Sequence, residues 1–306
     1  LENFMKVVHS HFTAQKGDSD LFEKYKSLKR VDLEGNMMSV SRAFDDSLKM
    51  MRYHKSRYVS VQNLHDLDAI AEEDAFGFIN KMFSNASGFY FIFSGDLNET
   101  LLREYVQKYI ATIPGNQSNA TGWNNVPVYI KKYNQRTHLK GEIGYNLYNI
   151  TIHSAATYAL QDIAVMSIIG NGLESRITSE LGRLGIPVKS DFSISVFPEE
   201  FFTISIDCRT SEEMVLDIFG KVAQDGFSDR EVGNVKKGML EHFRRAESFD
   251  NAFWIDVLTS RFIYGKDFYS RFNQVVGNIT PAEVNRRVKE YINGSTYTIL
   301  TMEGTK

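Results

Sequence analysis

The sequence is poor in cysteine and has no long apolar run, and each absence narrows the classes of protein to consider. Cys208 is the only cysteine among the 306 residues, so the chain has no disulfide framework and no cysteine-based zinc site. No apolar run approaches the roughly 18–20 residues that a membrane-spanning helix requires. Charge of one sign is also lacking, since 35 Lys and Arg are balanced by 38 Asp and Glu. Their scattered positions exclude a basic surface for nucleic acid or an anionic membrane.

The composition does provide enough apolar material for one or two globular domains. Hydrophobic residues make up 42% of the chain and charged residues 24%, proportions typical of ordered domains with a sizeable core. The sequence has no signal-peptide pattern, and Leu1 already lies within an apolar stripe of helical period. We therefore expect the chain to be a processed piece or a fragment of a longer protein.

The first part of the chain is predicted to be mainly helical, with one strand. Apolar residues recur at helical spacing over residues 1–28. The apolar run Gly88–Gly95, GFYFIFSG, is bounded by glycines, which predicts a buried strand. Asn98 can then cap a helix that ends before Pro114. Because the next residues are polar and rich in turn formers, we assign a first domain, a linker and a second domain to residues 1–114, 115–126 and 127–306.

The second part is predicted to contain strands, then helices, then a closing strand. Strands are predicted at 126–133, 145–153 and 295–302. Alternating apolar and polar residues at 192–196 and 202–206 predict two more strands, which form an antiparallel hairpin. Capping-box spacing to a glutamate predicts three helix starts, at Thr210, Ser228 and Thr280. This order indicates an α+β fold in which helices pack on one face of a mostly antiparallel sheet.

The segment Gly170-Asn171-Gly172 lies between two runs of helical period, so a role in phosphate binding has to be weighed. A dinucleotide fingerprint needs a strand before the glycines and a further glycine after them. Here the preceding run has the period of a helix, and Ser175 holds the third glycine position. We therefore interpret Gly170, Asn171 and Gly172 as a structural glycine loop that ends one helix and lets the next begin.

The residue patterns of known catalytic centres are missing. Gly238-Met-Leu-Glu-His242 differs by one residue from His-x-x-Glu-His, but a zinc site needs two imidazoles one helical turn apart, and glycine supplies none. There is no Gly-x-Ser-x-Gly, and Cys208 has no histidine close to it in the sequence. We predict no catalytic residue and no metal ligand in this chain.

Several segments together resemble one family, the pitrilysin-type zinc metallopeptidases or inverzincins. They are FIFSGDLNETLLREYVQKYIATIP, ALQDIAVMSIIGNGLESRITSELGRLG, FSDREVGNVKKGMLEHF and ITPAEVNRRVKEYI, while NAFWIDVLTSRFIYG is similar to the large bacterial tandem members. The resemblance implies pitrilysin-like α+β domains, here one partial copy followed by one complete copy. Because His-x-x-Glu-His is absent, the chain resembles the non-catalytic C-terminal half.

The resemblance also implies cofactors, partners and a compartment. Zinc is expected in a partner half and not in this chain, and the expected partners are that zinc-bearing half and an extended peptide. In active relatives an Arg and a Tyr of this half contact substrate; here Gly182 and either Val188 or Lys189 hold those positions. Arg183 and Lys189 are therefore the candidate peptide contacts. Homodimerisation stays open, and a bacterial periplasm or cell envelope is the favoured compartment.

Two main interpretations from different classes follow. In the first, the chain is the non-catalytic half of a zinc metallopeptidase, inactive by itself, which holds an extended peptide by adding it as a strand to a sheet edge. In the alternative, the chain is an inactive scaffold or interaction module of a larger complex without a substrate role, which the loss of the Arg and Tyr pair favours. A third interpretation, a stand-alone zinc enzyme, requires ligands that the sequence does not show.

Overall fold

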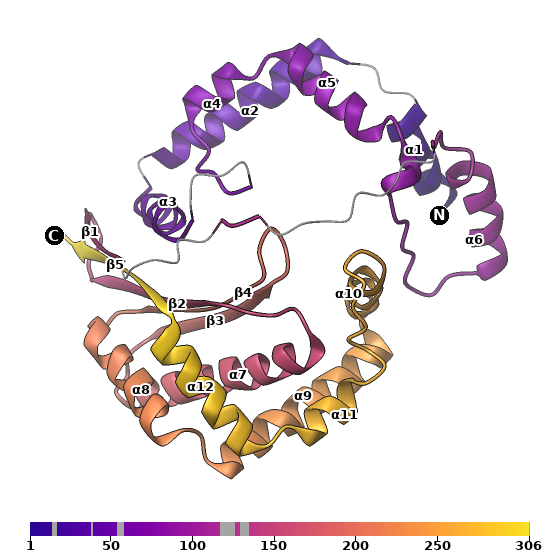
Figure 1. Ribbon diagram of the computed structural model, residues 1–306. Coiled ribbons are helices and arrows are strands. Elements are labelled where there is room, and N and C mark those ends of the chain that lie inside the picture. The colour runs from indigo at the N-terminus through magenta and orange to yellow at the C-terminus, as the bar shows by residue number, and fades with distance from the viewer. Residues whose placement is uncertain (14–16, 38, 54–57, 117–125, 129–134, 306) are drawn as a thin grey trace. The chain divides into compact units, whose positions relative to one another are not determined.

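The computed structural model describes two compact units of the chain (Figure 1). The described residues are 1–13, 17–37, 39–53, 58–116, 126–128 and 135–305. Unit 1 comprises Leu1–Met38, Gln62–Trp123 and Trp254–Leu258, and unit 2 comprises Ser39–Val61, Asn124–Phe253 and Thr259–Lys306. Most of the predicted linker at 115–126 lies outside the described residues.

Unit 1 consists of helices joined by short connections. They are α1 (Glu2–Thr13), α2 (Ser19–Met37), α4 (Leu64–Ala69), α5 (Glu72–Phe83), η1 (Ala86–Gly88), α6 (Glu99–Tyr105) and η2 (Val106–Ile110). Asn98 caps α6 as predicted, because its side chain accepts a hydrogen bond from the Leu101 N–H at 3.0 Å. Between α2 and α4 the link is polar, since the Lys26 ammonium donates to the carbonyl oxygen of Ile70 at 2.8 Å.

The prediction of a buried strand at Gly88–Gly95 is wrong. None of these residues pairs with another strand in the part of the chain that the structure describes, and the side chains of Phe89 and Tyr90 are 37% and 54% exposed. Phe89 and Phe91 instead place their rings 4.9 Å and 6.0 Å from the ring of Phe12 on α1. The apolar run is therefore packed on helices, and no strand lies beside it among the described residues.

Unit 2 is built on a five-stranded sheet. Its strands are β1 (Gln135–Gly141), β2 (Leu147–Ala155), β3 (Val188–Ser195), β4 (Phe201–Cys208) and β5 (Thr296–Gly304), in the order β1-β5-β2-β4-β3. The predicted antiparallel hairpin is confirmed as β3 and β4, and two further predicted strands are confirmed as β2 and β5. The sheet is mixed, because β1 runs parallel to β5. Of the strand predicted at 126–133, residues 129–133 lie outside the described residues, and 126–128 are not in a strand.

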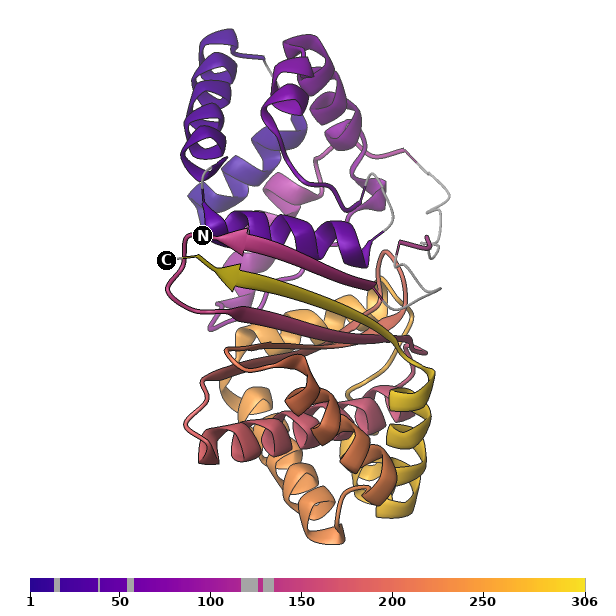
Figure 2. The ribbon, with the colours of Figure 1, turned by 90° about the vertical axis from the view of Figure 1, so that its left-hand side faces the viewer.

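Helices cover one face of this sheet, which confirms the α+β architecture (Figure 1). The helices that follow β2 are α7 (Leu160–Arg183), α8 (Glu212–Asp225), α9 (Asp229–Phe249), α10 (Asn251–Phe262), α11 (Phe272–Asn278) and α12 (Pro281–Gly294). The prediction placed helices on one face only, but the opposite face also carries a helix. There α3 (Val40–Arg52) lies along β5 and β1 (Figure 2) and buries Phe44 and Leu48 against Leu300 and Met302.

Two of the three predicted helix starts form as expected. Ser228 and Glu231 make a complete capping box at the start of α9. The Thr280 hydroxyl accepts a hydrogen bond from the Glu283 N–H at 3.2 Å, and Pro281 is the first residue of α12. The prediction for Thr210 is wrong, because α8 begins at Glu212 after Ser211 and has no side-chain cap.

The prediction of two helices joined by a glycine loop is also wrong, because α7 runs without a break from Leu160 to Arg183. Gly170 and Gly172 are buried inside this helix. A Cβ built on Gly170 lies 2.6 Å from the ring of Phe192, and one built on Gly172 lies 2.9 Å from the ring of Phe227. The two glycines therefore let α7 approach these rings closely, and they do not turn the chain.

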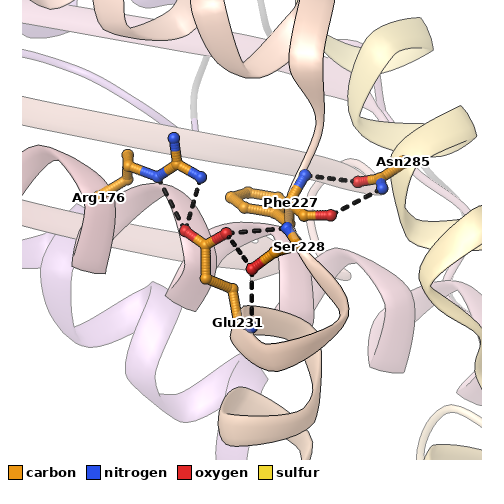
Figure 3. A network of polar contacts seen from close by, with 5 residues as sticks. All are labelled: Arg176, Phe227, Ser228, Glu231 and Asn285. Carbon is orange, nitrogen blue, oxygen red and sulfur yellow. Dashed lines mark hydrogen bonds and ion pairs between the residues drawn. The ribbon is translucent and has the colours of Figure 1, made fainter.

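A polar network fixes α7, α9 and α12 to one another beside Phe227 (Figure 3). The backbone N–H of Phe227 donates to Asn285 at 2.7 Å, and the Asn285 amide donates back to the Phe227 carbonyl at 2.9 Å. Glu231 accepts two hydrogen bonds from the Arg176 guanidinium, at 2.6 and 2.9 Å, and others from Ser228. Arg176 thus anchors α7 to the first turn of α9, and Asn285 anchors α12 to Phe227, two residues before α9 begins.

Candidate functional site

The face of the sheet that carries α3 is apolar at β5, where Leu300 and Met302 lie, and polar across β3, β4 and β2. Side chains alternate between faces along a strand, so isoleucines of β2 and β4 enter the helix-covered core and the intervening residues face the other way. Strand pairing arranges them in three rows across β3, β4 and β2: Lys189, Asp207 and Asn149; Asp191, Ser205 and Thr151; Ser193, Thr203 and His153. We call these nine residues the polar face.

Arg52, the last residue of α3, brings a positive charge to the polar face. Its guanidinium donates to Asn149 Oδ1 at 2.8 Å, to Ser205 Oγ at 3.1 Å and to the Thr151 hydroxyl. Asn149 in turn donates to Asp207 Oδ1 at 2.6 Å. Asn149 and Thr151 are fully buried, and buried polar groups are stable only when hydrogen-bonded. Arg52 therefore adds a charged donor to a network in which Thr151 already donates to Asn149 Oδ1, at 2.8 Å, and Asn149 to Ser205 Oγ, at 3.0 Å.

His153 lies in the same face and is held neutral. Its side chain is 2% exposed, and its ring centroid is 5.4 Å from that of Phe201. Burial lowers the pKa of His153 to about 4, and the charge of Arg52 acts in the same direction. At neutral pH the imidazole is thus uncharged.

Strand β3 forms one edge of the sheet, beyond which no further strand lies among the described residues. Its side chains Lys189, Asp191 and Ser193 are exposed. An edge strand directs alternate N–H and C=O groups outward, where they can pair with another extended chain. Lys189, a candidate from the sequence, thus lies on this edge. Arg183, the other candidate, is the exposed last residue of α7.

The residues considered for metal binding and catalysis do not meet. Within residues 1–13, 17–37, 39–53, 58–116, 126–128 and 135–305, no group of three His, Cys, Asp or Glu side chains is arranged to hold a metal ion. His242 is exposed on α9. Cys208 is buried at the end of β4, and burial raises the pKa of its thiol. Within the same residues no helix is both long and apolar enough to cross a membrane.

Arg52 was not predicted from the sequence as a member of this network. It lies 97 residues before Asn149 in the chain, so no local spacing links the two. A signal was present in the polar members of the alternating strands, since Asn149, Thr151 and His153 are buried polar residues that alternate with the isoleucines of the core. Three successive polar residues on one side of a central strand indicate a face that needs a polar partner.

Comparison with known proteins identifies the family. The family described as Peptidase M16 inactive domain matches residues 69–239, which is more than half of the chain. The chain therefore belongs to the Peptidase M16 inactive domain family. A comparison with curated protein sequences finds no match.

Solved structures agree with this assignment at the level of the fold. The periplasmic protease PqqL from Escherichia coli superposes with a TM-score of 0.80 at 13% identity, over 99% of this chain and 35% of that one. A peptidase M16 inactive domain from Pseudomonas fluorescens gives 0.76 at 14% identity, over 100% and 75%. A mutant of the ferredoxin protease FusC, solved in complex with Arabidopsis ferredoxin, gives 0.71 at 14% identity, over 100% and 34%. The chain thus spans about a third of the length of PqqL and of FusC.

Proposed function

We propose that the chain is the non-catalytic half of a zinc metallopeptidase and that it holds an extended peptide on the β3 edge of unit 2. The observation that carries this proposal is the edge position of β3 within the described sheet, with the exposed side chains of Lys189, Asp191 and Ser193. An added strand gains main-chain hydrogen bonds whatever its sequence, which suits a protein that takes unfolded segments. The periplasmic and ferredoxin-cleaving proteases of similar fold support a protein or peptide as the ligand.

In this proposal the zinc and the hydrolytic water belong to a partner half, because the chain has no His-x-x-Glu-His. The chain alone therefore binds peptide without cutting it. Lys189 adds a positive charge beside the bound strand, and Arg183 is the second candidate contact. A periplasmic location is proposed on the same grounds, from the likeness to PqqL.

Binding is tested with a fluorescein-labelled, unstructured peptide of about 20 residues and net negative charge. We expect a saturable rise in anisotropy with a Kd between about 1 and 100 μM, together with slower amide hydrogen exchange in β3 and unchanged exchange in β1. Lys189→Glu is expected to weaken binding roughly three- to tenfold. The matched control is Lys237→Glu, since Lys237 is an exposed lysine of α9 and its replacement should leave the Kd unchanged.

The same titration separates the proposal from its alternative. An inactive scaffold without a substrate role binds no peptide below about 100 μM and shows no change of exchange in β3. The absence of the substrate-contacting Arg and Tyr, where Gly182 and either Val188 or Lys189 stand, is the observation that favours the scaffold. Steady hydrolysis of a quenched peptide by the chain alone would contradict both.

A further inference from the structure

The helices of unit 2 leave one margin of the sheet uncovered, at β1. Arg136 of β1 pairs in register with Ile299 of β5, and residues paired across neighbouring strands point to the same face of a sheet. Ile299 belongs to the helix-covered core, so Arg136, His138 and Lys140 lie on the helix side as well. Unlike Ile299, these three side chains are exposed. On this side of the sheet the helices therefore cover β5 and not β1.

A groove of about 610 Å³ lies at this margin, between α8, α12, β5 and β1 of unit 2. Helices α8 and α12 are neighbours (Figure 1). The apolar part of the lining is Leu216, Phe219, Ala223, Ile292, Tyr297 and Ile299. The stretch of α8 that lines the groove, from Leu216 to Gln224, is about 12 Å long at 1.5 Å per residue. A volume of this size is typical of a site for a small molecule.

Gly220 of α8 widens the groove. Apart from the backbone of its own turns of α8, no atom of the described residues lies within 4 Å of a Cβ built on Gly220. A glycine inside a helix is unfavourable relative to alanine, and here no close contact requires it, in contrast to Gly170 and Gly172. Because Gly220 lines the groove, the space left by its missing side chain is part of the groove.

The charged residues of the groove are cations. Among the described residues that line it, Arg136 and Lys289 are charged and none is acidic. Arg136 forms an ion pair with Glu212, the first residue of α8, which offsets its charge. Lys289 forms no ion pair within the described part of the chain, whereas Arg286 and Arg287 on the same helix each do. The uncompensated positive charge of the groove therefore belongs to Lys289.

Amide groups add to this polar rim. Gln224 of α8 and Asn293 of α12 are exposed and line the groove. Asn293 follows Lys289 by one helical turn, so the two side chains lie on the same side of α12. The Tyr297 hydroxyl donates to the carbonyl oxygen of Ile292 at 3.1 Å, and the ring is what Tyr297 adds to the lining. The rim thus suits an anionic group, and the walls suit an apolar chain.

We propose that this groove binds a fatty carboxylate, whose apolar chain lies along α8 and whose carboxylate pairs with Lys289. Burial of the chain against partly exposed residues such as Leu216 and Ala223 drives the association. The charge of Lys289 selects a carboxylate over a cation of the same length. A lining of about 12 Å matches an extended chain of about ten carbons.

Binding is tested by isothermal titration calorimetry of the full chain with sodium decanoate. We expect saturable binding with a Kd between about 10 and 300 μM. Gly220→Leu places a side chain inside the groove and should weaken binding at least about tenfold. The matched control is Gly238→Leu, because Gly238 is an exposed glycine of α9 with equally open space at its Cβ and does not line the groove. Its Kd should stay within about twofold of the wild type.

A second comparison tests the charge. The wild type should bind decanoate at least about tenfold more tightly than decyltrimethylammonium, and Lys289→Gln should reduce this ratio to below about threefold. Lys237→Gln, at an exposed lysine of α9, is the matched control and should leave the ratio unchanged. Circular dichroism checks that each variant is folded.

Three outcomes would overturn the proposal. They are no saturable binding of decanoate up to about 2 mM, binding that Gly220→Leu leaves unchanged, and equal affinity of the wild type for decanoate and decyltrimethylammonium. The groove lies at β1 and the proposed peptide site at β3, on opposite edges of the sheet. Failure of this test therefore leaves the peptide-binding proposal standing, and the reverse.

Discussion

The ring of Phe192 lies directly against the backbone of Gly170, so close that a Cβ on the glycine would be 2.6 Å from the ring. Strand β3 and helix α7 are thereby packed at an approach that glycine alone permits. We predict that Gly170→Ala destabilises unit 2 by about 1–2 kcal/mol, because the overpacking cost exceeds the gain in helix propensity. Urea denaturation followed by circular dichroism measures the difference.

Gly182 gives the control for this prediction within the same helix. No atom lies within 4 Å of a Cβ built there, so Gly182→Ala should be neutral or stabilise by up to about 1 kcal/mol. If both alanine variants shift the unfolding midpoint in the same direction, close packing at Phe192 is not what Gly170 provides.

The second prediction concerns the polar face. Arg52→Ala removes a charged donor from Asn149, Thr151 and Ser205 and should cost about 1–3 kcal/mol, since hydrogen bonds to a charged group are stronger than neutral ones. Arg42→Ala is the control on the same helix, because Arg42 pairs with Asp46 only one turn away. We expect less than about 1 kcal/mol there. If the two variants lose the same free energy of unfolding, the loss comes from weakening α3 itself and not from removing the hydrogen bonds of Arg52.

A third prediction follows from the buried imidazole. The pKa of His153 is lowered to about 4, against about 6.5 in an unfolded chain. Between these values the unfolded state binds more protons than the folded state, so the free energy of unfolding decreases as the pH falls from about 6.5 to 4, by roughly 2–3 kcal/mol.

His153→Gln isolates this contribution, since glutamine does not titrate. The variant should lose that part of the pH dependence in urea titrations at about pH 7.5, 5.5 and 4.5, whereas His242→Gln, at an exposed histidine, should retain it. Parallel curves for the wild type and His153→Gln would contradict the assignment.

The fourth prediction is the metal content. We expect close to zero zinc per chain by atomic absorption after dialysis against trace zinc and washing, because no ligand cluster forms in the part of the chain described and His242 has no second imidazole one helical turn away. A ratio near one that His242→Ala abolishes would reopen the interpretation as a zinc enzyme.

Local patterns were enough to predict the hairpin β3–β4 and the capping box at Ser228. Strict alternation of side chains specifies a strand, and a capping box is formed by residues three apart. Whether the helix ends or continues at Gly170 could not be predicted from local patterns. Local propensity favours ending a helix at Gly-Asn-Gly, and only the rings of Phe192 and Phe227 show why the helix continues.

The network on the polar face was not predicted, and the strand predicted at Gly88–Gly95 does not form, for a different reason. Arg52 meets Asn149 only through tertiary packing, and periodicity carries no information about such distant pairs. The run Gly88–Gly95 was recognised correctly as apolar, but a strand is defined by its neighbours, and the described residues provide none.

The position of α3 has a practical consequence for anyone who cuts this chain into parts. By sequence α3 belongs to the first half, yet it covers Leu300 and Met302 and holds the network at Asn149. An expressed segment that starts at residue 127 would expose Leu300 and Met302 and remove the Arg52 donor from the polar face, and the exposed apolar surface would promote aggregation. Co-expression with residues 39–61, or a short tether that returns them, is the way to obtain unit 2 by itself.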